Sequence, residues 1–163
     1  MSTIPTHRRI EYARGYLELG MSKEAAAELN TIASSDQNSI AVLRVYVDLF
    51  MDTKQWTKVI AAAEPVCKST PKDEGAWIAW AYALRELQQT KEAQDVLLRA
   101  EPLHEKTCDV LHYNLACYAC LLGNLKEARR RLTKAIKMDK QWQESALSDT
   151  DLETMWSEIR EMK

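Results

Sequence analysis

The chain has 163 residues, a length that predicts one compact domain or a short array of repeats. It contains only four glycines, four prolines and one phenylalanine, which excludes a collagen or a linker-rich chain and argues against an all-β domain. With 46% hydrophobic residues the chain can form a core, and a formal net charge of −2 gives no overall attraction to nucleic acid or to an anionic membrane.

Apolar residues recur at helical spacing over most of the chain, from its start to about residue 138. Ser22 and Thr90 are expected to be N-caps, and Pro71 and Pro102 lie where helices are expected to stop. Pro65 falls inside a predicted helix and therefore predicts a kink or an early end. The predicted helices lie near residues 6–19, 22–34, 39–52, 55–69, 74–87, 90–101, 108–122 and 125–138.

The pattern changes after Lys140. Residues 141–147 are expected to form one or two helical turns, and Thr150 and Glu153 have the spacing of a capping box at the start of a last helix. One apolar stripe follows that helix, and it consists of Leu152, Met155, Trp156 and Ile159. A helix of this kind is suited to covering the open end of a repeat array.

Short segments between the predicted helices resemble one another, which indicates an internal repeat. Each ends on a small residue, and these residues are separated by 34, 34 and 35 positions: Ala25, Val59, Ala93 and Ala128. A period of about 34 residues is typical of a helix-turn-helix repeat. Small residues at fixed positions let the two helices of a repeat cross closely.

The chain resembles the tetratricopeptide repeat (TPR) family over about residues 6–142. The best match is the fourth repeat, which carries Asn114–Tyr118, Gly123, Ala128, Leu132 and Ala135. The resemblance implies an all-α, right-handed superhelix (an α-solenoid) of four helix-turn-helix repeats and a C-terminal capping helix. It places the repeats at about 6–39, 40–73, 74–107 and 109–142 in a single array over 1–163, with the cap at 143–163. Residues 146–152 resemble the closing segment of many bacterial members.

In this family the first helix of each repeat lines a concave groove, so the resemblance also implies contact residues. Arginines among them are suited to pairing with carboxylates of a partner, and tyrosines are typical interface anchors. A solvated surface on which these charges pair with one another is the alternative. Carried over by position, the groove residues are His7, Ile10, Arg14, Leu17, Arg44, Asp48, Met51, Ile78, Tyr82, Arg85, Tyr113 and Cys117.

A cluster of histidines and cysteines raises a different possibility, because neutral His and Cys are the preferred ligands of zinc. Cysteine is also a common small core residue, and a redox C-x-x-C pair normally belongs to a βαβ context that this chain lacks. We therefore favour packing residues and keep a zinc or redox protein as an alternative. The cluster consists of His104, Cys108, His112, Cys117 and Cys120.

A basic run follows the helix predicted at 125–138. Arg129, Arg130 and Arg131 point in three directions around a helix, so we interpret the run as a solvated face and not as a nucleic-acid interface. The sequence has no glycine-rich phosphate loop, no Gly-x-Ser-x-Gly and no His-Glu-x-x-His motif, so we expect no enzyme activity and no cofactor.

The sequence thus predicts a non-enzymatic interaction module, an adaptor that holds a protein or peptide segment in its groove. A type III secretion-like chaperone of a secreted protein is the main alternative. The first residues lack a secretory signal and no stretch approaches 18 apolar residues, so we expect a cytoplasmic protein with no membrane or nucleic-acid partner. The first repeat and Trp156 leave a homodimer surface open as a hypothesis.

Overall fold

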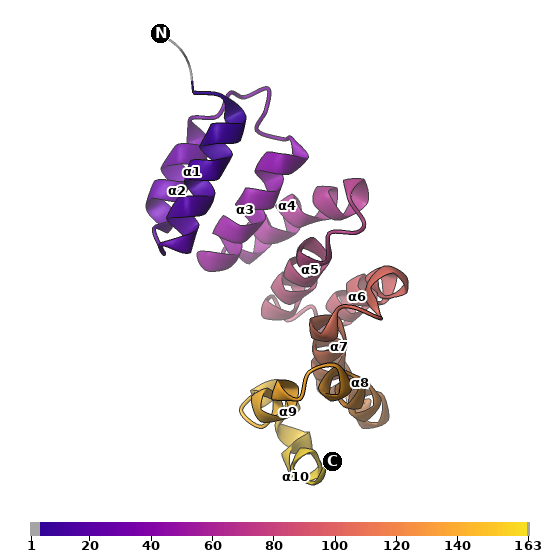
Figure 1. Cartoon of the computed structure of the whole chain (residues 1–163). Helices are drawn as coiled ribbons and strands as arrows, with labels where there is room; N and C mark the ends of the chain where they lie inside the picture. Colours follow the sequence, from indigo (N-terminus) through magenta and orange to yellow (C-terminus); the bar gives the residue numbers. More distant parts are fainter. Residues whose placement is uncertain (1–3, 163) are drawn as a thin grey trace. The chain divides into compact units, whose positions relative to one another are not determined.

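The computed structural model describes residues 4–162, and all regular elements in that range are helical. The chain divides into two compact units, of which unit 1 ends at Ala83 and unit 2 begins at Leu84. Unit 1 contains α1 (Thr6–Glu18), α2 (Ser22–Asn30), α3 (Ile40–Asp52), α4 (Trp56–Ser69) and most of α5 (Glu74–Glu86). Unit 2 contains the end of α5, then α6 (Thr90–His104), α7 (Asp109–Leu121), α8 (Leu125–Met138), α9 (Gln141–Ala146), the 3₁₀-helix η1 (Thr150–Met155) and α10 (Trp156–Glu161) (Figure 1).

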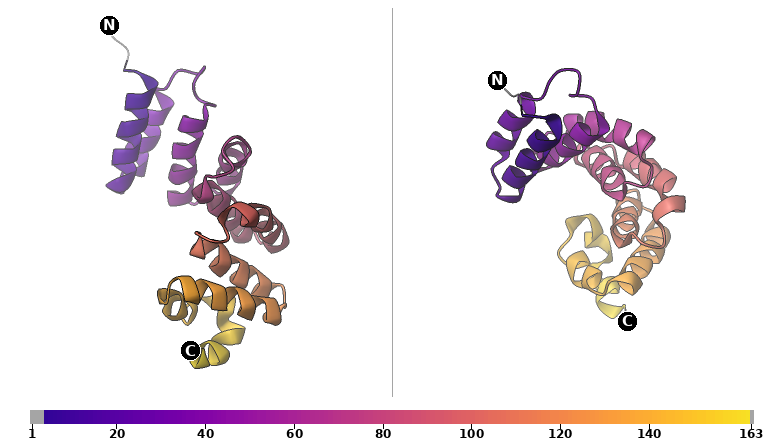
Figure 2. Two further views of the ribbon diagram at one scale, coloured as in Figure 1. Left: turned by 45° about the vertical axis from the view of Figure 1, so that its right-hand side comes forward. Right: turned by 45° about the horizontal axis from the view of Figure 1, so that its top comes forward.

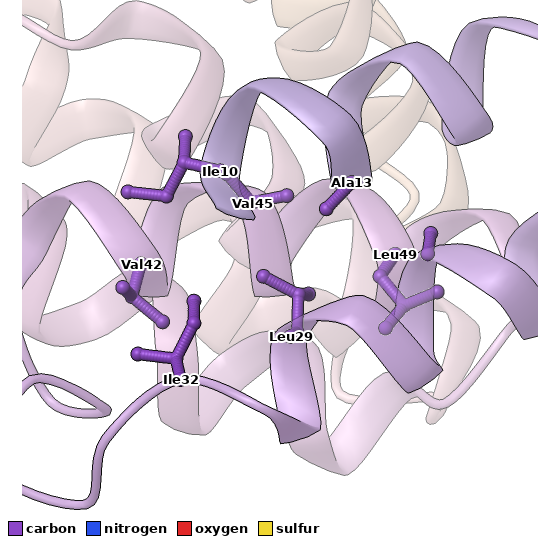
Figure 3. Close-up of a cluster of buried hydrophobic side chains, with 8 residues drawn as sticks. Ile10, Ala13, Leu29, Ile32, Val42, Val45 and Leu49 are labelled. Carbon is purple, nitrogen blue, oxygen red and sulfur yellow. The ribbon is translucent and has the colours of Figure 1, made fainter. Parts of the chain in front are cut away.

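The core of unit 1 is an aliphatic cluster between α1, α2 and α3 (Figure 3). Helices α1 and α2 run side by side in both views of Figure 2 and are in contact. Ala13 and Ala25 have no exposed surface, because these small residues lie where the two helices cross. The cluster consists of Ile10, Ala13, Ala25, Leu29, Ile32, Val42, Val45 and Leu49.

The core of unit 2 is built around α7, which contacts α6, α8 and η1. Nine of its residues, from Leu111 to Cys120, are buried, so this helix is enclosed on nearly all sides. Ala128, Leu132 and Ala135 of α8 are fully buried and provide the small and aliphatic residues that a close helix pair requires.

One turn recurs at four places, at intervals of 34, 34 and 35 residues. The backbone has a positive φ at Gly20 (71°), Lys54 (55°), Gln88 (62°) and Gly123 (79°). In each case the N–H of the next residue donates to the carbonyl of the residue four positions before the turn residue, as in Met21 to Tyr16 at 2.8 Å. This is the Schellman arrangement that ends a helix in a left-handed residue, and it explains the abrupt reversal between paired helices.

Several helix ends differ from the sequence predictions. Helix α2 ends at Asn30 and not near residue 34, because the Gln37 amide donates to the carbonyls of Leu29 (2.9 Å) and Ile32 (3.0 Å) and holds the following loop. Helix α6 continues through Pro102 to His104, so the expected stop at Pro102 is wrong. Helix α4 likewise continues through Pro65 to Ser69, and the early end does not occur.

The predicted helix N-caps at Ser22, Thr90 and Thr150 are wrong. The N-cap residues of α2 and α6 are Met21 and Gln89, which provide no side-chain bond, while Ser22 and Thr90 are the first helical residues. Ser22 instead donates its hydroxyl to Asp52. In place of the predicted capping box at Thr150, Asp149 caps η1 by accepting a hydrogen bond from the Asp151 N–H.

Within unit 2, η1 packs against α7, and α10 packs against η1 and α9. Leu152, Met155 and Ile159 of the predicted apolar stripe are buried, but the stripe runs over η1 and α10 instead of one regular helix. The Trp156 indole, predicted as an exposed dimer contact, donates to the carbonyls of Ala146 (3.0 Å) and Asp149 (3.2 Å) within its own unit. None of the helices described combines the length and the apolar character that crossing a membrane requires.

Candidate binding surface

A hollow of about 270 Å³ lies on unit 1 beside α1, α3 and the start of α5. We call it the arginine hollow. Its charged lining residues are Arg14 of α1, Arg44 and Asp48 of α3, and Asp73 of the loop before α5, and small residues of α5 complete the lining. Its lining consists of Arg14, Arg44, Val47, Asp48, Asp73, Gly75, Ala76 and Ala79.

The arginines of this hollow differ in how they are engaged. Arg44 is paired with Asp73, whose Oδ2 lies 2.5 Å from Nε. Arg14 is exposed and forms no ion pair with any residue of the range that the structure describes. Desolvation raises the pKa of the Asp48 carboxyl above its ordinary value, with Arg14 and Arg44 acting in the opposite direction. Arg14 is therefore exposed and outside any ion pair among residues 4–162, while its charge still acts on Asp48.

The other predicted groove residues of unit 1 are distributed unevenly. His7 is exposed, and Tyr82 is 39% exposed with its ring edge against Trp56 at 5.8 Å. Leu17, Met51 and Ile78 are half-buried, and Leu17 packs on the aliphatic cluster. Ile10 lies within that cluster with 9% of its surface exposed, so the structure places it in the core.

In unit 2 the predicted groove residues are covered by the chain itself. From here on, the closing segment means residues 146–156, which include the run 146–152 noted in the sequence. Tyr113 donates to Oδ2 of Asp149 at 2.8 Å, and the Cys117 thiol lies 3.7 Å from the same oxygen. Arg85 holds Asp151 with two nitrogens, the Nε bond measuring 2.8 Å. Cys120, one turn further along α7, lies 3.2 Å from the Thr154 hydroxyl.

Burial beneath the closing segment changes the acidity of these groups. Desolvation raises the pKa of the Tyr113 hydroxyl far above its ordinary value, with Cys117 and Asp149 acting in the same direction. Desolvation also raises the pKa of the Cys117 thiol strongly, and the two aspartates of the segment add to the effect. Both groups therefore stay protonated and act as hydrogen-bond donors. A thiol in this state is a poor nucleophile and a poor metal ligand.

The histidine and cysteine cluster is not assembled as the zinc alternative requires. Among residues 4–162, the ligand atoms that come together in a group of three or more belong to Cys117, Asp149 and Asp151. In that group Asp151 already binds the Arg85 guanidinium and Asp149 accepts from Tyr113. His112 is fully buried, and its Nε2 lies 2.7 Å from the Glu105 carbonyl, to which it must donate. The arrangement supports hydrogen bonding and packing.

The basic run on α8 is partly a buried network and not wholly a solvated face. Arg131 is 4% exposed and contacts both oxygens of Glu101 on α6, with its Nε also 2.7 Å from Glu127. The bond to Arg130, together with that to Arg131, lowers the pKa of Glu127 to about 2. Arg129 pairs with Glu158 at 2.6 Å. The expectation of a solvated face is therefore wrong for Arg131, which stabilises the packing of α6 on α8.

Sequence reasoning missed the acidic partners of the arginines. Asp73, Asp149 and Asp151 lie in or beside loops, and none stands at a groove position of the repeat. The one local signal is the pair of aspartates in the run Ser148–Leu152, between α9 and the end of η1. Trp142 of α9 was not among the predicted contacts either, although its ring stacks on Tyr113 at 4.2 Å.

Paired helices joined by one recurring turn are typical of helical-repeat proteins. Comparison with solved structures shows which repeat fold the chain resembles. The chain superposes on the structure of MamA protein with a TM-score of 0.78 at 15% identity, covering 96% of this chain and 87% of that one. A second MamA structure, MSR-1, gives 0.72 at 18% identity over 82% of this chain and 76% of that one. YrrB, described as a TPR protein with an unusual peptide-binding site, gives 0.72 at 14% identity over 93% of this chain and 76% of that one.

These similarities show that the chain has a TPR-like, all-α fold, which confirms the fold class and the resemblance predicted from the sequence. The sequence matches no protein-family model and no curated protein.

Proposed function

We propose that the chain is a non-enzymatic protein-interaction module, an adaptor that binds a segment of another protein or a peptide. The observation that supports it is the arginine hollow of unit 1, where an exposed Arg14 stands beside small residues of α5 without an ion-pair partner among residues 4–162. YrrB, which has a similar fold and an unusual peptide-binding site, supports the same class of function.

In this proposal Arg14 pairs with a carboxylate of the bound segment, since a guanidinium is suited to bidentate contacts with carboxylates. Asp48 and Asp73 accept N–H groups of the segment or pair with a basic residue. The exposed Tyr82 buries an apolar side chain of the partner, because tyrosine combines an apolar ring with a polar hydroxyl. The contact surface is extended by His7, Leu17, Met51 and Ile78.

The proposal includes an organisation in four repeats, at about 6–39, 40–73, 74–107 and 109–142, followed by a cap at 143–163. The chain then acts in the cytoplasm without a cofactor, and its partner is a protein and not a nucleic acid or a membrane. An adaptor is preferred to an enzyme because the sequence carries no glycine-rich phosphate loop, no Gly-x-Ser-x-Gly and no His-Glu-x-x-His motif.

The proposal is tested by selecting peptides from a phage-displayed random library on the full-length protein and measuring their affinity for variants. Arg14→Gln is expected to weaken the selected peptides about tenfold, and Arg44→Gln and Tyr82→Ala by several-fold, because hot spots are few and often involve Arg and Tyr. Arg8→Gln is the matched control, since Arg8 lies on the same helix, is exposed, and pairs with Glu11 away from the hollow.

Retained affinity in all three variants would place binding elsewhere and overturn the proposal. So would equal losses in Arg8→Gln and Arg14→Gln, which would indicate nonspecific attraction to positive charge. Each variant is first checked for an unchanged melting temperature, so that a lost affinity reports the contact and not the fold.

A further inference from the structure

We propose that the surface formed by Arg85, Tyr113, Cys117 and Cys120, here called the α7 site, recognises acidic segments with two aspartates one residue apart. The chain's own closing segment occupies this site as an internal ligand. The inference rests on the proposed function, which it deepens by giving the chemical class of a second partner segment.

The first support is the identity of the residues that hold the closing segment. Arg85, Tyr113 and Cys117 occupy positions at which TPR-type helices are predicted to contact a partner. All three are engaged by carboxylates of the segment, through contacts that cross 66, 36 and 32 residues of sequence. The segment therefore makes the contacts expected of a bound peptide, although it belongs to the same chain.

The second support is the chemistry of the two aspartates. Asp151 receives a two-point contact from Arg85, which fits a carboxylate better than any other side chain. Asp149 receives the Tyr113 hydroxyl and the Cys117 thiol, and its second oxygen caps the backbone N–H of Asp151 at 3.0 Å. A spacing of one residue lets the Asp149 carboxylate accept the backbone N–H of Asp151. The same spacing lets Asp149 reach Tyr113 and lets Asp151 reach Arg85.

The third support is that polar recognition and apolar anchoring are carried by different residues. Leu152 and Met155 of η1 are buried, whereas Asp149 and Asp151 are half-buried and remain close to solvent. A partner segment with the pattern Asp-x-Asp-Leu supplies the same carboxylates and the first apolar anchor. It can therefore replace the closing segment residue for residue.

The closing segment has the advantage in this competition, because a tethered ligand has an effective concentration in the millimolar range. An external segment binds when the internal one is weakened or when its own affinity is higher. This predicts a site that is hidden in the intact protein and is exposed by a change in the two aspartates.

The test uses a fluorescent peptide with the sequence of residues 146–156, added to the full-length protein and followed by fluorescence anisotropy. Asp149→Asn with Asp151→Asn weakens the internal ligand while keeping side chains of the same shape, and Asn is still a good cap. The peptide is expected to bind this double variant at least about tenfold more tightly than the wild type. Adding Arg85→Gln should abolish that binding, whereas adding Lys126→Gln, an exposed cation on α8, should not.

A folded double variant that fails to bind the peptide would overturn the inference, as would equal binding to the wild type and the double variant. A peptide with both aspartates replaced by asparagine should lose its affinity, and unchanged affinity would also contradict the site. If the double variant does not fold, Asp151→Asn alone takes its place, because Asp149 then still caps η1.

The experiment also separates this inference from the proposed function. Arg14 lies in unit 1, so adding Arg14→Gln to the double variant should leave binding of the closing-segment peptide unchanged. Loss of that binding in Arg14→Gln but not in Arg85→Gln would overturn the α7 site and would support the arginine hollow as the acidic-segment site.

Discussion

The two units use the same pair of residue types, arginine and aspartate, with opposite outcomes. In unit 1 the arginine hollow has a volume of about 270 Å³. Arg14 is exposed there, and Arg44 is paired with Asp73. In unit 2, Arg85 and Tyr113 are covered by the closing segment, which brings its own aspartates to them. A predicted contact position is therefore available to a partner only where no other part of the chain already occupies it.

The units also differ in what stabilises them. The core described in unit 1 is an aliphatic cluster, and its Arg9–Glu28 pair is partly exposed. Unit 2 contains a buried arginine, two buried histidines and the largely buried helix α7. Unit 2 should therefore respond more strongly to the loss of a polar group and to acid, which leads to three predictions in order of decreasing effect.

Arg131→Ala should destabilise unit 2 by about 3 kcal/mol, because it leaves Glu101 without its charged partner in a partly buried position. Arg9→Ala in unit 1 is the matched control and should cost about 1 kcal/mol or less, because the Arg9 side chain is 22% exposed and pairs with Glu28 alone, whereas the Arg131 side chain is 5% exposed and pairs with both Glu101 and Glu127. Hydrogen exchange of α7 and α8 under mild urea measures the loss of stability in Arg131→Ala. Exchange of α1 and α2 measures the loss in Arg9→Ala. Equal losses in the two units would contradict the contrast between them.

Lowering the pH from 7.5 to 5.5 should destabilise unit 2 by about 1 kcal/mol through His112. Desolvation lowers the pKa of His112, and the Glu105 carbonyl bond opposes that shift. Lys134 and Arg131 lower the pKa further, while Glu101 raises it. A group whose pKa is lower in the folded state contributes stability above its unfolded pKa of about 6.5 and loses it as the pH falls.

Urea unfolding of the wild type, His112→Phe and His7→Gln measures this effect. The loss between pH 7.5 and 5.5 should largely disappear in His112→Phe and persist in His7→Gln, since His7 is exposed. An unchanged loss in His112→Phe would show that another group is responsible.

The recurring turn gives the smallest effects and should be the feature that the two units share. Lys54→Gly and Gln88→Gly should each stabilise the protein by about 0.5 kcal/mol, because a side chain is strained at positive φ. Gly20→Ala and Gly123→Ala should each cost about 1 kcal/mol for the same reason. Thermal unfolding of the four variants measures the expected gains and losses of stability. A loss of stability in Lys54→Gly would show that its side chain contributes contacts that outweigh the strain.

The all-α class and most helix bounds could be predicted because their signals are local. Small residues recur every 34 or 35 positions, and each turn is set by a few neighbouring residues. The same turn at Lys54 and Gln88 shows that the repeat imposes a left-handed residue even where glycine is absent. Helix ends were predicted less well, as at Asn30, because a side chain seven residues later, Gln37, determines where the backbone bonds go.

The candidate site was predicted only in part, for a physical reason. The position of a residue in a helix predicts which face of the helix it lies on, but not which other elements cover that face. Arg14 and Arg44 therefore line the hollow as predicted, whereas Ile10 lies in the core. The contact between Arg85 and Asp151 joins residues 66 positions apart and leaves no periodic trace in the sequence. The contacts of Tyr113 and Cys117 with Asp149 cross 36 and 32 residues and likewise leave no local signal.

The central claim is that the arginine hollow is open to a partner while the α7 site is occupied by the chain itself. Hydrogen exchange of the 163-residue chain with and without a library-selected peptide separates the two surfaces. New protection is expected in α1, α3 and the start of α5, with exchange in α7 unchanged. Protection confined to α4 or α8, with no change at α1 and α3, would contradict the claim.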